Sequence, residues 1–106
     1  MCNHQYDITA IIYDKKGNVI SIGHNSYLKT HPLQAYYAKK AGEQYEKKIF
    51  IHAELDAVLK AGSRIDKAYM IRVFRFNSKG EPRCAKPCPV CQEMLKHTPI
   101  KVIEHT

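Results

Sequence analysis

The sequence lacks the features that would place it in a membrane or outside the cell. In its 106 residues no apolar run approaches the roughly 18 residues that a membrane-spanning helix needs. Residues 1–7 do not show the basic-then-apolar layout of a signal peptide. The sequence also contains no internal repeat, low-complexity stretch or linker. We therefore expect one globular domain, residues 1–106, in the cytoplasm.

Acidic residues are scarce relative to basic ones. There are 10 Asp and Glu against 17 Lys and Arg, which gives a formal net charge of +7. Most of the excess falls in residues 60–101, with ten basic and three acidic side chains, whereas residues 1–59 carry seven and six. A basic region attracts phosphate, whether on a nucleotide or along a strand. The alternative is a generally cationic surface with no specific partner.

The four cysteines are too unevenly placed to indicate a disulfide framework. Three of them, Cys84, Cys88 and Cys91, lie within eight residues, and in a reducing compartment such clustering indicates metal binding. If a helix begins near residue 88, Cys88 and Cys91 share one face of its first turn. Pro87 and Pro89 suit a helix start, and the helix dipole there favours the metal-binding thiolate.

A second segment, His52-Ala53-Glu54, adds an imidazole and a carboxylate. Residues two apart on a regular helix point about 200° away from each other, so His52 and Glu54 share a pocket only if His52 precedes the helix. We therefore predict a helix that begins at about residue 53 and is closed by Gly62. His52, Cys88 and Cys91 would supply the three ligands of a catalytic zinc ion, which keeps one position open.

The rest of the sequence alternates between strand and helix patterns. A hairpin is predicted from two β-branched, apolar segments around a turn rich in Gly, Asn and Asp. Strands that follow helices predict parallel pairing in a central sheet. The expected elements are strands at 7–13 and 19–23, a helix at 33–42, a strand at 68–76, a polar loop at 77–86 and a strand at 100–103.

H-x-E followed by P-C-x-x-C resembles the zinc-dependent nucleobase deaminases. The chain is similar to the cytidine and deoxycytidylate deaminase superfamily, which implies an α/β, three-layer fold with a mixed central sheet flanked by helices. Family members commonly continue with another strand and helix after the last strand seen here, so we expect a C-terminally short version. An exposed sheet edge would follow, and self-association would be one way to cover it.

The resemblance also implies roles for individual residues. Glu54 would be the catalytic proton shuttle and not a ligand of Zn²⁺, while Asn25 would contact the sugar and the backbone N–H of Ala53 the base edge. Asn25 has a second interpretation as a simple turn former. His24 and His31 are further candidates for substrate binding, at the mouth of the pocket.

The activity implied is the hydrolytic deamination of cytosine to uracil in a nucleoside or nucleotide. Zinc lowers the pKa of water towards neutrality, and one carboxyl group then moves the protons. A cytosine or adenine deaminase acting on single-stranded DNA or RNA is the first alternative. A non-enzymatic, zinc-braced module that binds nucleic acid is the second. The second requires a closed site that includes Cys84 and His97, which leaves the His52-Ala53-Glu54 segment unexplained.

Overall fold

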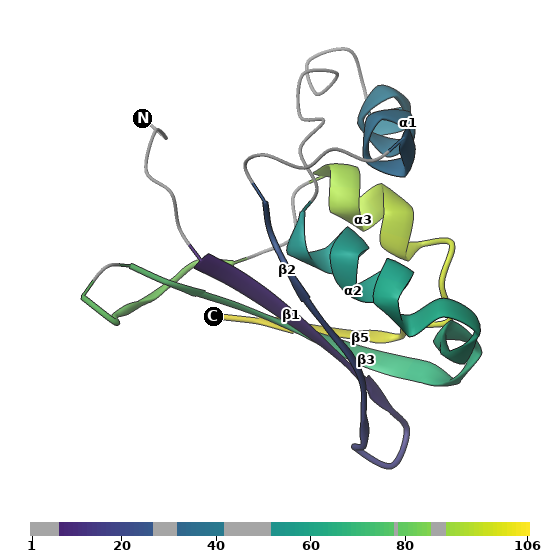
Figure 1. Ribbon diagram of the computed structural model, residues 1–106, viewed down its shortest axis with the longest axis horizontal. Coiled ribbons are helices and arrows are strands. Elements are labelled where there is room, and N and C mark those ends of the chain that lie inside the picture. The colour runs from purple at the N-terminus through teal and green to yellow at the C-terminus, as the bar shows by residue number, and fades with distance from the viewer. Residues whose placement is uncertain (1–6, 27–31, 42–51, 78, 86–88) are drawn as a thin grey trace.

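The computed structural model describes residues 7–26, 32–41, 52–77, 79–85 and 89–106. These residues form an α/β fold in which helices pack on a mixed sheet of five strands (Figure 1). The elements in chain order are β1 (Asp7–Asp14), β2 (Val19–His24), α1 (Pro32–Ala41), α2 (Ala53–Ala61), the 3₁₀ helix η2 (Gly62–Lys67), β3 (Ala68–Phe76), β4 (Pro82–Arg83), α3 (Pro89–Leu95) and β5 (Val102–His105).

The predicted hairpin is confirmed, and its turn is held by one carboxylate. Asp14 Oδ1 accepts hydrogen bonds from the backbone N–H groups of Lys16 and Asn18, at 2.9 and 2.8 Å. Gly17 has a φ of +88°, in the left-handed region that glycine adopts without steric cost. The turn therefore combines the two residue types from which it was predicted, an Asp and a Gly.

The sheet is mixed because of the direction in which β3 runs. The strand order is β2-β1-β3, and both β4 and β5 pair with the remaining side of β3. Parallel pairing after a helix is confirmed for β5, which runs parallel to β3. Beside β1, a pairing that the sequence pattern did not predict, β3 runs antiparallel. The crossover through α2 makes β3 parallel to β2, but β1 lies between those two strands.

Two other predictions differ from the structure in detail. The last strand spans residues 102–105 instead of 100–103, and the polar loop contains the short strand β4. Among the described residues β5 pairs only with β3, which agrees with the expected open edge. Self-association through that edge stays a prediction.

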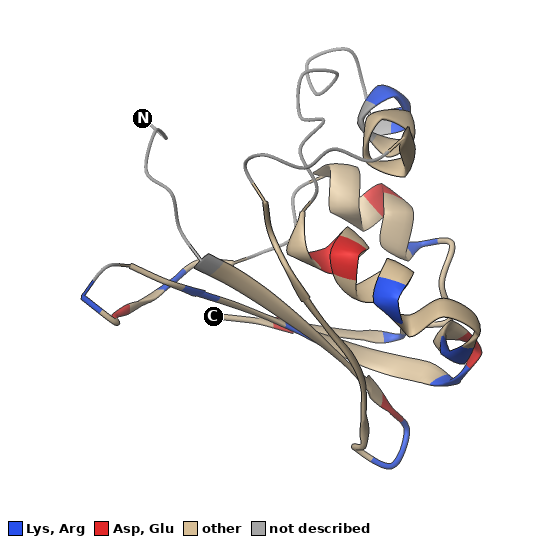
Figure 2. Ribbon diagram, in the orientation of Figure 1, with Lys and Arg blue, Asp and Glu red and all other residues tan. Residues whose placement is uncertain are grey.

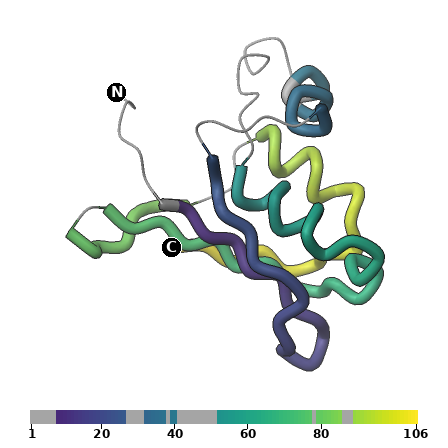
Figure 3. The backbone as a smooth tube through the Cα atoms, viewed as in Figure 1, coloured from purple at the N-terminus to yellow at the C-terminus, as the bar shows by residue number. Residues whose placement is uncertain are grey.

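The core lies between the sheet and α2 with α3. Side chains on this face of the sheet, such as Ala10, Ile12, Ile71 and Val73, are fully buried. Alternate residues on the other face are more exposed, among them Ile22. The described helices lie on one side of the sheet, as the ribbon and the tube both show (Figures 1 and 3). No helix in the described part of the chain is long and apolar enough to cross a membrane.

Strand β2 and helix α2 approach each other with almost nothing between their backbones. A methyl group at Gly23 would overlap the backbone nitrogen of Ala57 and the carbonyl oxygen of Ala53. Two residues before Gly23 on β2, Ser21 Oγ donates a hydrogen bond of 2.7 Å to the Ala57 carbonyl. Small residues on both elements thus bring the end of β2 directly against the start of α2.

Candidate metal and catalytic site

The start of α2 has the geometry that the sequence predicts. His52 is the N-cap residue with φ −89° and ψ 156°, an extended conformation, and the helix begins at Ala53. At the other end Gly62 caps the helix, with its N–H donating to the Leu59 carbonyl. Because His52 lies outside helical geometry, its side chain and that of Glu54, on the first turn, are free to converge.

His52, Glu54 and Cys91 form a group that can hold a metal ion. One ligand atom from each lies within 4.8 Å of the others. His52 Nδ1 and Cys91 Sγ are 3.2 Å apart. Two such ligands on one tetrahedral zinc ion would be about 3.6 Å apart, given Zn–N near 2.05 Å and Zn–S near 2.3 Å. The spacing therefore needs only a small adjustment to fit zinc.

Burial and donor chemistry also suit zinc. Cys91 on α3 is 1% exposed and Glu54 is 6% exposed, so both lie in the protein interior. Imidazole and thiolate are ligands that zinc prefers. Cys88, the third predicted ligand, lies outside the described residues.

Of the predicted substrate-binding residues, Asn25 has a clear structural role. Its Oδ1 accepts a hydrogen bond from the backbone N–H of Ile8, and its own N–H donates to the Ile8 carbonyl, at 2.9 and 3.2 Å. These bonds prolong the β1–β2 pairing past the end of β2. Ala53 is buried at the first position of α2, where a helix leaves its N–H groups without intrahelical acceptors.

Of the two histidine candidates, the structure describes only His24. His24 pairs with Thr9, and its Nδ1 lies 3.3 Å from Thr9 Oγ1. Its neighbour Gly23 faces α2, so the His24 side chain points to the opposite face of the sheet. This orientation does not support a place for its imidazole at the pocket. His31 lies outside the described residues.

Sequence reasoning missed two polar residues that hold the site together. Asp56 Oδ2 accepts the backbone N–H of His24 at 2.9 Å and also pairs with Lys60 Nζ at 2.9 Å, which fixes the end of β2 to α2. Gln34 on α1 accepts the backbone N–H of His52 at 3.1 Å. Asp56 is a second acidic residue in the first turn of α2, after Glu54, and this could have indicated its role. No feature of the sequence indicated a role for Gln34.

The closed structural site is not supported by the positions of Cys84 and His97. Cys84 is exposed, and its carbonyl accepts a hydrogen bond from Arg75 Nη1 at 3.2 Å. His97 lies against Tyr37, with ring centroids 5.7 Å apart, and 3.5 Å from Glu93. Among the residues that the structure describes, neither belongs to the group of potential metal ligands.

Comparisons with known proteins agree with this geometry at the level of a family. The family model described as "Cytidine and deoxycytidylate deaminase zinc-binding region" matches residues 2–104, nearly the whole chain. No curated protein and no solved structure matches the chain. The match therefore concerns the domain and its zinc region and carries no information on the substrate.

Proposed function

Because the chain belongs to the cytidine and deoxycytidylate deaminase zinc-binding family, we propose that it is a zinc-dependent hydrolytic deaminase that converts cytosine to uracil in a nucleotide or nucleoside. The observation that carries this proposal is the convergence of His52, Glu54 and Cys91 from two helices. A structural zinc site needs only its ligands. The carboxylate beside the imidazole and the thiol is an additional group, of the kind that proton transfer requires.

We assign the metal to His52 and Cys91, together with Cys88. Zinc held by these residues would supply Lewis acidity and would lower the pKa of water towards neutrality. Three protein ligands would leave the open position of a catalytic site. The 3.2 Å separation of His52 Nδ1 and Cys91 Sγ supports the assignment of both as ligands of one ion.

Glu54 has the role of the proton shuttle in this proposal. It takes a proton from the attacking water and delivers it to the ring nitrogen next to the carbon that bears the amino group. The water oxygen is then bonded to the ring carbon as a hydroxyl group, and Glu54 takes the second proton from that hydroxyl. It passes this proton to the amino group as the carbon–nitrogen bond breaks, so ammonia leaves, a carbonyl remains and the net reaction is hydrolysis. Its buried position keeps bulk water from competing for these protons.

Substrate contacts fall on the adjoining end of β2. We assign to the N–H of Ala53, at the first position of α2, a hydrogen bond to the base edge. We assign a sugar contact to Asn25, which lies next to the start of α2 and whose Oδ1 accepts the Ile8 N–H. Asp56 and the close approach at Gly23 hold this strand end against α2.

The distribution of charge favours a small anionic substrate over a long polymer. Basic residues lie at both ends of β3, with Lys60, Arg64 and Lys67 in or next to η2 at one end and Lys79 and Arg83 in the β3–β4 hairpin at the other (Figure 2). Arg72 and Arg75 lie on β3 between these two groups. A strand nine residues long separates these groups by about 30 Å. Between them, Arg72 pairs with Glu104 at 2.7 Å and Arg75 donates to the Cys84 carbonyl at 3.2 Å, so these two cations are less available to a nucleic-acid backbone.

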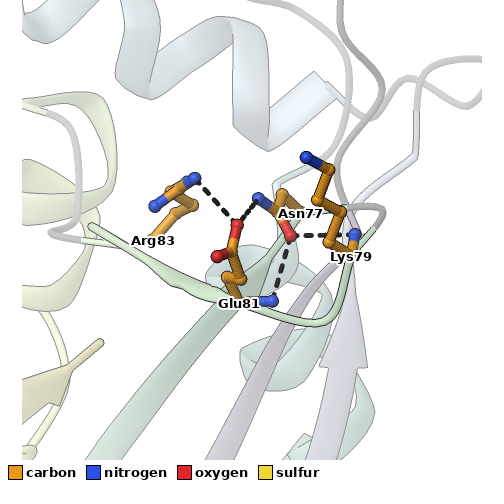
Figure 4. Close-up of polar contacts among 4 residues, drawn as sticks. All are labelled: Asn77, Lys79, Glu81 and Arg83. Atoms are coloured by element: carbon orange, nitrogen blue, oxygen red, sulfur yellow. Dashed lines mark hydrogen bonds and ion pairs between the residues drawn. The ribbon is translucent and has the colours of Figure 1, made fainter.

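The polymer alternative rests on the β3–β4 hairpin. Phe76, at the base of this hairpin, pairs with Asp7. The next residue on β1, Ile8, bonds through its backbone to Asn25. The hairpin therefore lies at the site end of the sheet. Asn77 Oδ1 accepts the N–H groups of Lys79 and Glu81, which orders the turn (Figure 4). The hairpin presents Lys79 and Arg83, although Arg83 also pairs with Glu81 at 3.3 Å.

Replacement of Glu54 tests the enzymatic proposal against a non-enzymatic zinc module. Glu54→Ala should retain the fold and one zinc per chain but lose at least about 100-fold in ammonia release, the contribution of a positioned proton-transfer group. Glu93→Gln, a carboxylate change on α3, serves as the matched control and should keep its activity. Unchanged turnover in Glu54→Ala would remove the mechanism.

The substrate class requires a panel of compounds assayed with the wild-type protein. Cytidine, deoxycytidylate, free cytosine, adenosine and single-stranded oligonucleotides would be compared for deaminated product at low and high salt. We expect deoxycytidylate to be turned over with a modest salt effect. Preferred turnover of the oligonucleotide with a steep loss at high salt would favour the polymer alternative.

A further inference from the structure

Gln34 is a polar side chain in a place where apolar residues would be expected. It projects from α1 and is only 1% exposed. It lines a small internal space together with Tyr37, Leu55, Val90, Cys91 and Met94. An amide in such surroundings destabilises the fold unless it is hydrogen-bonded, and an apolar residue of the same size would pack as well.

The partner of Gln34 is the backbone of a residue at the metal site. Gln34 Oε1 accepts the His52 N–H at 3.1 Å. On its other side, the His52 carbonyl accepts the Asp56 N–H at 3.0 Å. The peptide groups before and after the His52 Cα are thus both fixed. The His52 side chain itself makes no capping hydrogen bond, and the Gln34 contact helps to hold the chain at its entry into α2.

Orientation of the imidazole depends on that backbone. In the extended conformation of His52, the ring reaches Cys91 with 3.2 Å between Nδ1 and Sγ. A rotation about φ of His52 would swing the ring away from α3. Metal ligands need their orientation fixed by neighbouring groups, and loss of such groups typically weakens metal affinity about 10–100-fold.

We propose that Gln34 is a positioning residue that holds His52 in the conformation in which its imidazole binds zinc. Through this bond α1, which otherwise packs on α3 and, through Tyr37, against His97 just after α3, takes part in forming the site. The inference rests on the zinc ligation assigned to His52 under the proposed function. It does not require that cytosine be the substrate.

Gln34→Met removes the acceptor while keeping helix propensity and volume. We expect zinc affinity to fall about 10–100-fold. The visible spectrum of the Co²⁺-loaded protein should change, because it reports the geometry of the ligands. For deamination we expect kcat to fall more than KM rises, since the change acts at the reacting centre.

Lys39→Gly provides a control for a merely structural role. Lys39 is exposed on α1, and glycine there weakens the helix by about 1 kcal/mol without touching its buried face. It should lower Tm yet leave zinc affinity and the Co²⁺ spectrum unchanged. If Lys39→Gly alters the metal readouts as much as Gln34→Met does, the docking of α1 and not the Gln34 bond is responsible, and the proposal fails.

Gln34→Glu is the conservative variant that keeps an acceptor at the same reach. Its zinc affinity should be at least about one third of the wild-type value, and its Co²⁺ spectrum should match that of the wild type. Should Gln34→Met fail to fold, this variant still decides, because a tenfold loss of affinity in Gln34→Glu would overturn the proposal. So would wild-type zinc affinity in a folded Gln34→Met. Both readouts use the metal alone, so they are independent of whether the proposed deaminase activity is found.

Discussion

At the scale of single residues, the contact at Gly23 shows how one missing methyl group shapes the site. The backbones of β2 and α2 touch there, because Gly23 faces Ala53 and Ala57. The same contact carries His24 and Asn25 to the start of α2, where Asp56 bonds to the His24 N–H. A larger residue would separate the strand from the helix and so move the proposed substrate contacts away from Glu54.

We therefore expect Gly23→Ala to destabilise the protein by about 2–3 kcal/mol, since two backbones would have to move apart. This corresponds to a fall in Tm of about 10–20 °C for a domain of this size, measured by thermal unfolding. Gly17→Ala is the comparison, because its methyl group would meet open space and only its φ of +88° causes strain. That strain is about 1 kcal/mol. Equal effects of the two changes would contradict the close-approach argument.

At the scale of elements, the β1–β2 hairpin depends on the ionised form of Asp14. Its carboxylate accepts three hydrogen bonds, from the N–H groups of Lys16 and Asn18 and from the Asn18 side chain. The bond from the Asn18 backbone is the main cause that lowers the pKa of Asp14 below its ordinary value of 3.8. The turn is exposed, so the effect concerns the hairpin more than the global fold.

A lowered folded-state pKa means that the contribution of Asp14 to stability is present above the unfolded value of 3.8. It is lost as the pH falls through the lower, folded value. An NMR titration of the Asp14 carboxyl carbon should give a midpoint below 3.8. The Lys16 and Asn18 amide resonances should shift with the same midpoint, and in Asp14→Asn they should not. A midpoint at or above 3.8 would refute the assignment.

Helix α2 illustrates which elements the sequence could predict. Its start at Ala53 and its cap at Gly62 follow from local rules, since the convergence of His52 and Glu54 requires an N-cap and glycine closes a helix. The direction of β3 relative to β1 does not follow from local rules. It depends on whether the crossover through α2 places β3 directly beside β2 or on the far side of β1. The residues on either side of α2 do not indicate which of these occurs.

At the scale of the whole molecule, zinc would join two halves of the fold. His52 begins α2 and Cys91 lies on α3, and the two helices cover the same face of the sheet (Figure 1). A metal bound between them links residues far apart in the sequence, so binding and folding are coupled. Removal of zinc should therefore lower the stability of the whole domain and not only that of the site.

We expect Cys91→Ala to lose the metal and to lower Tm by about 10 °C or more, because zinc at 100 times its Kd contributes about 2.7 kcal/mol. Cys84→Ala is the matched control, since that thiol is exposed and outside the ligand group. It should keep one zinc per chain by elemental analysis and the Tm of the wild type. A chelator should bring the wild type close to Cys91→Ala. One zinc per chain in Cys91→Ala would point to other ligands.

The residue types of the candidate site and the local structure around them could be predicted from the sequence alone. The residue types at 52, 54 and 91, the N-cap position of His52 and the extent of β3 all follow from short-range rules of helix capping, strand patterning and metal preference. Only the tertiary structure decided that Gln34 lies beneath His52, that His24 points away from α2 and that β3 runs antiparallel to β1. These features depend on which faces of separate elements meet, and that choice comes from packing over the whole chain and not from any one segment of it.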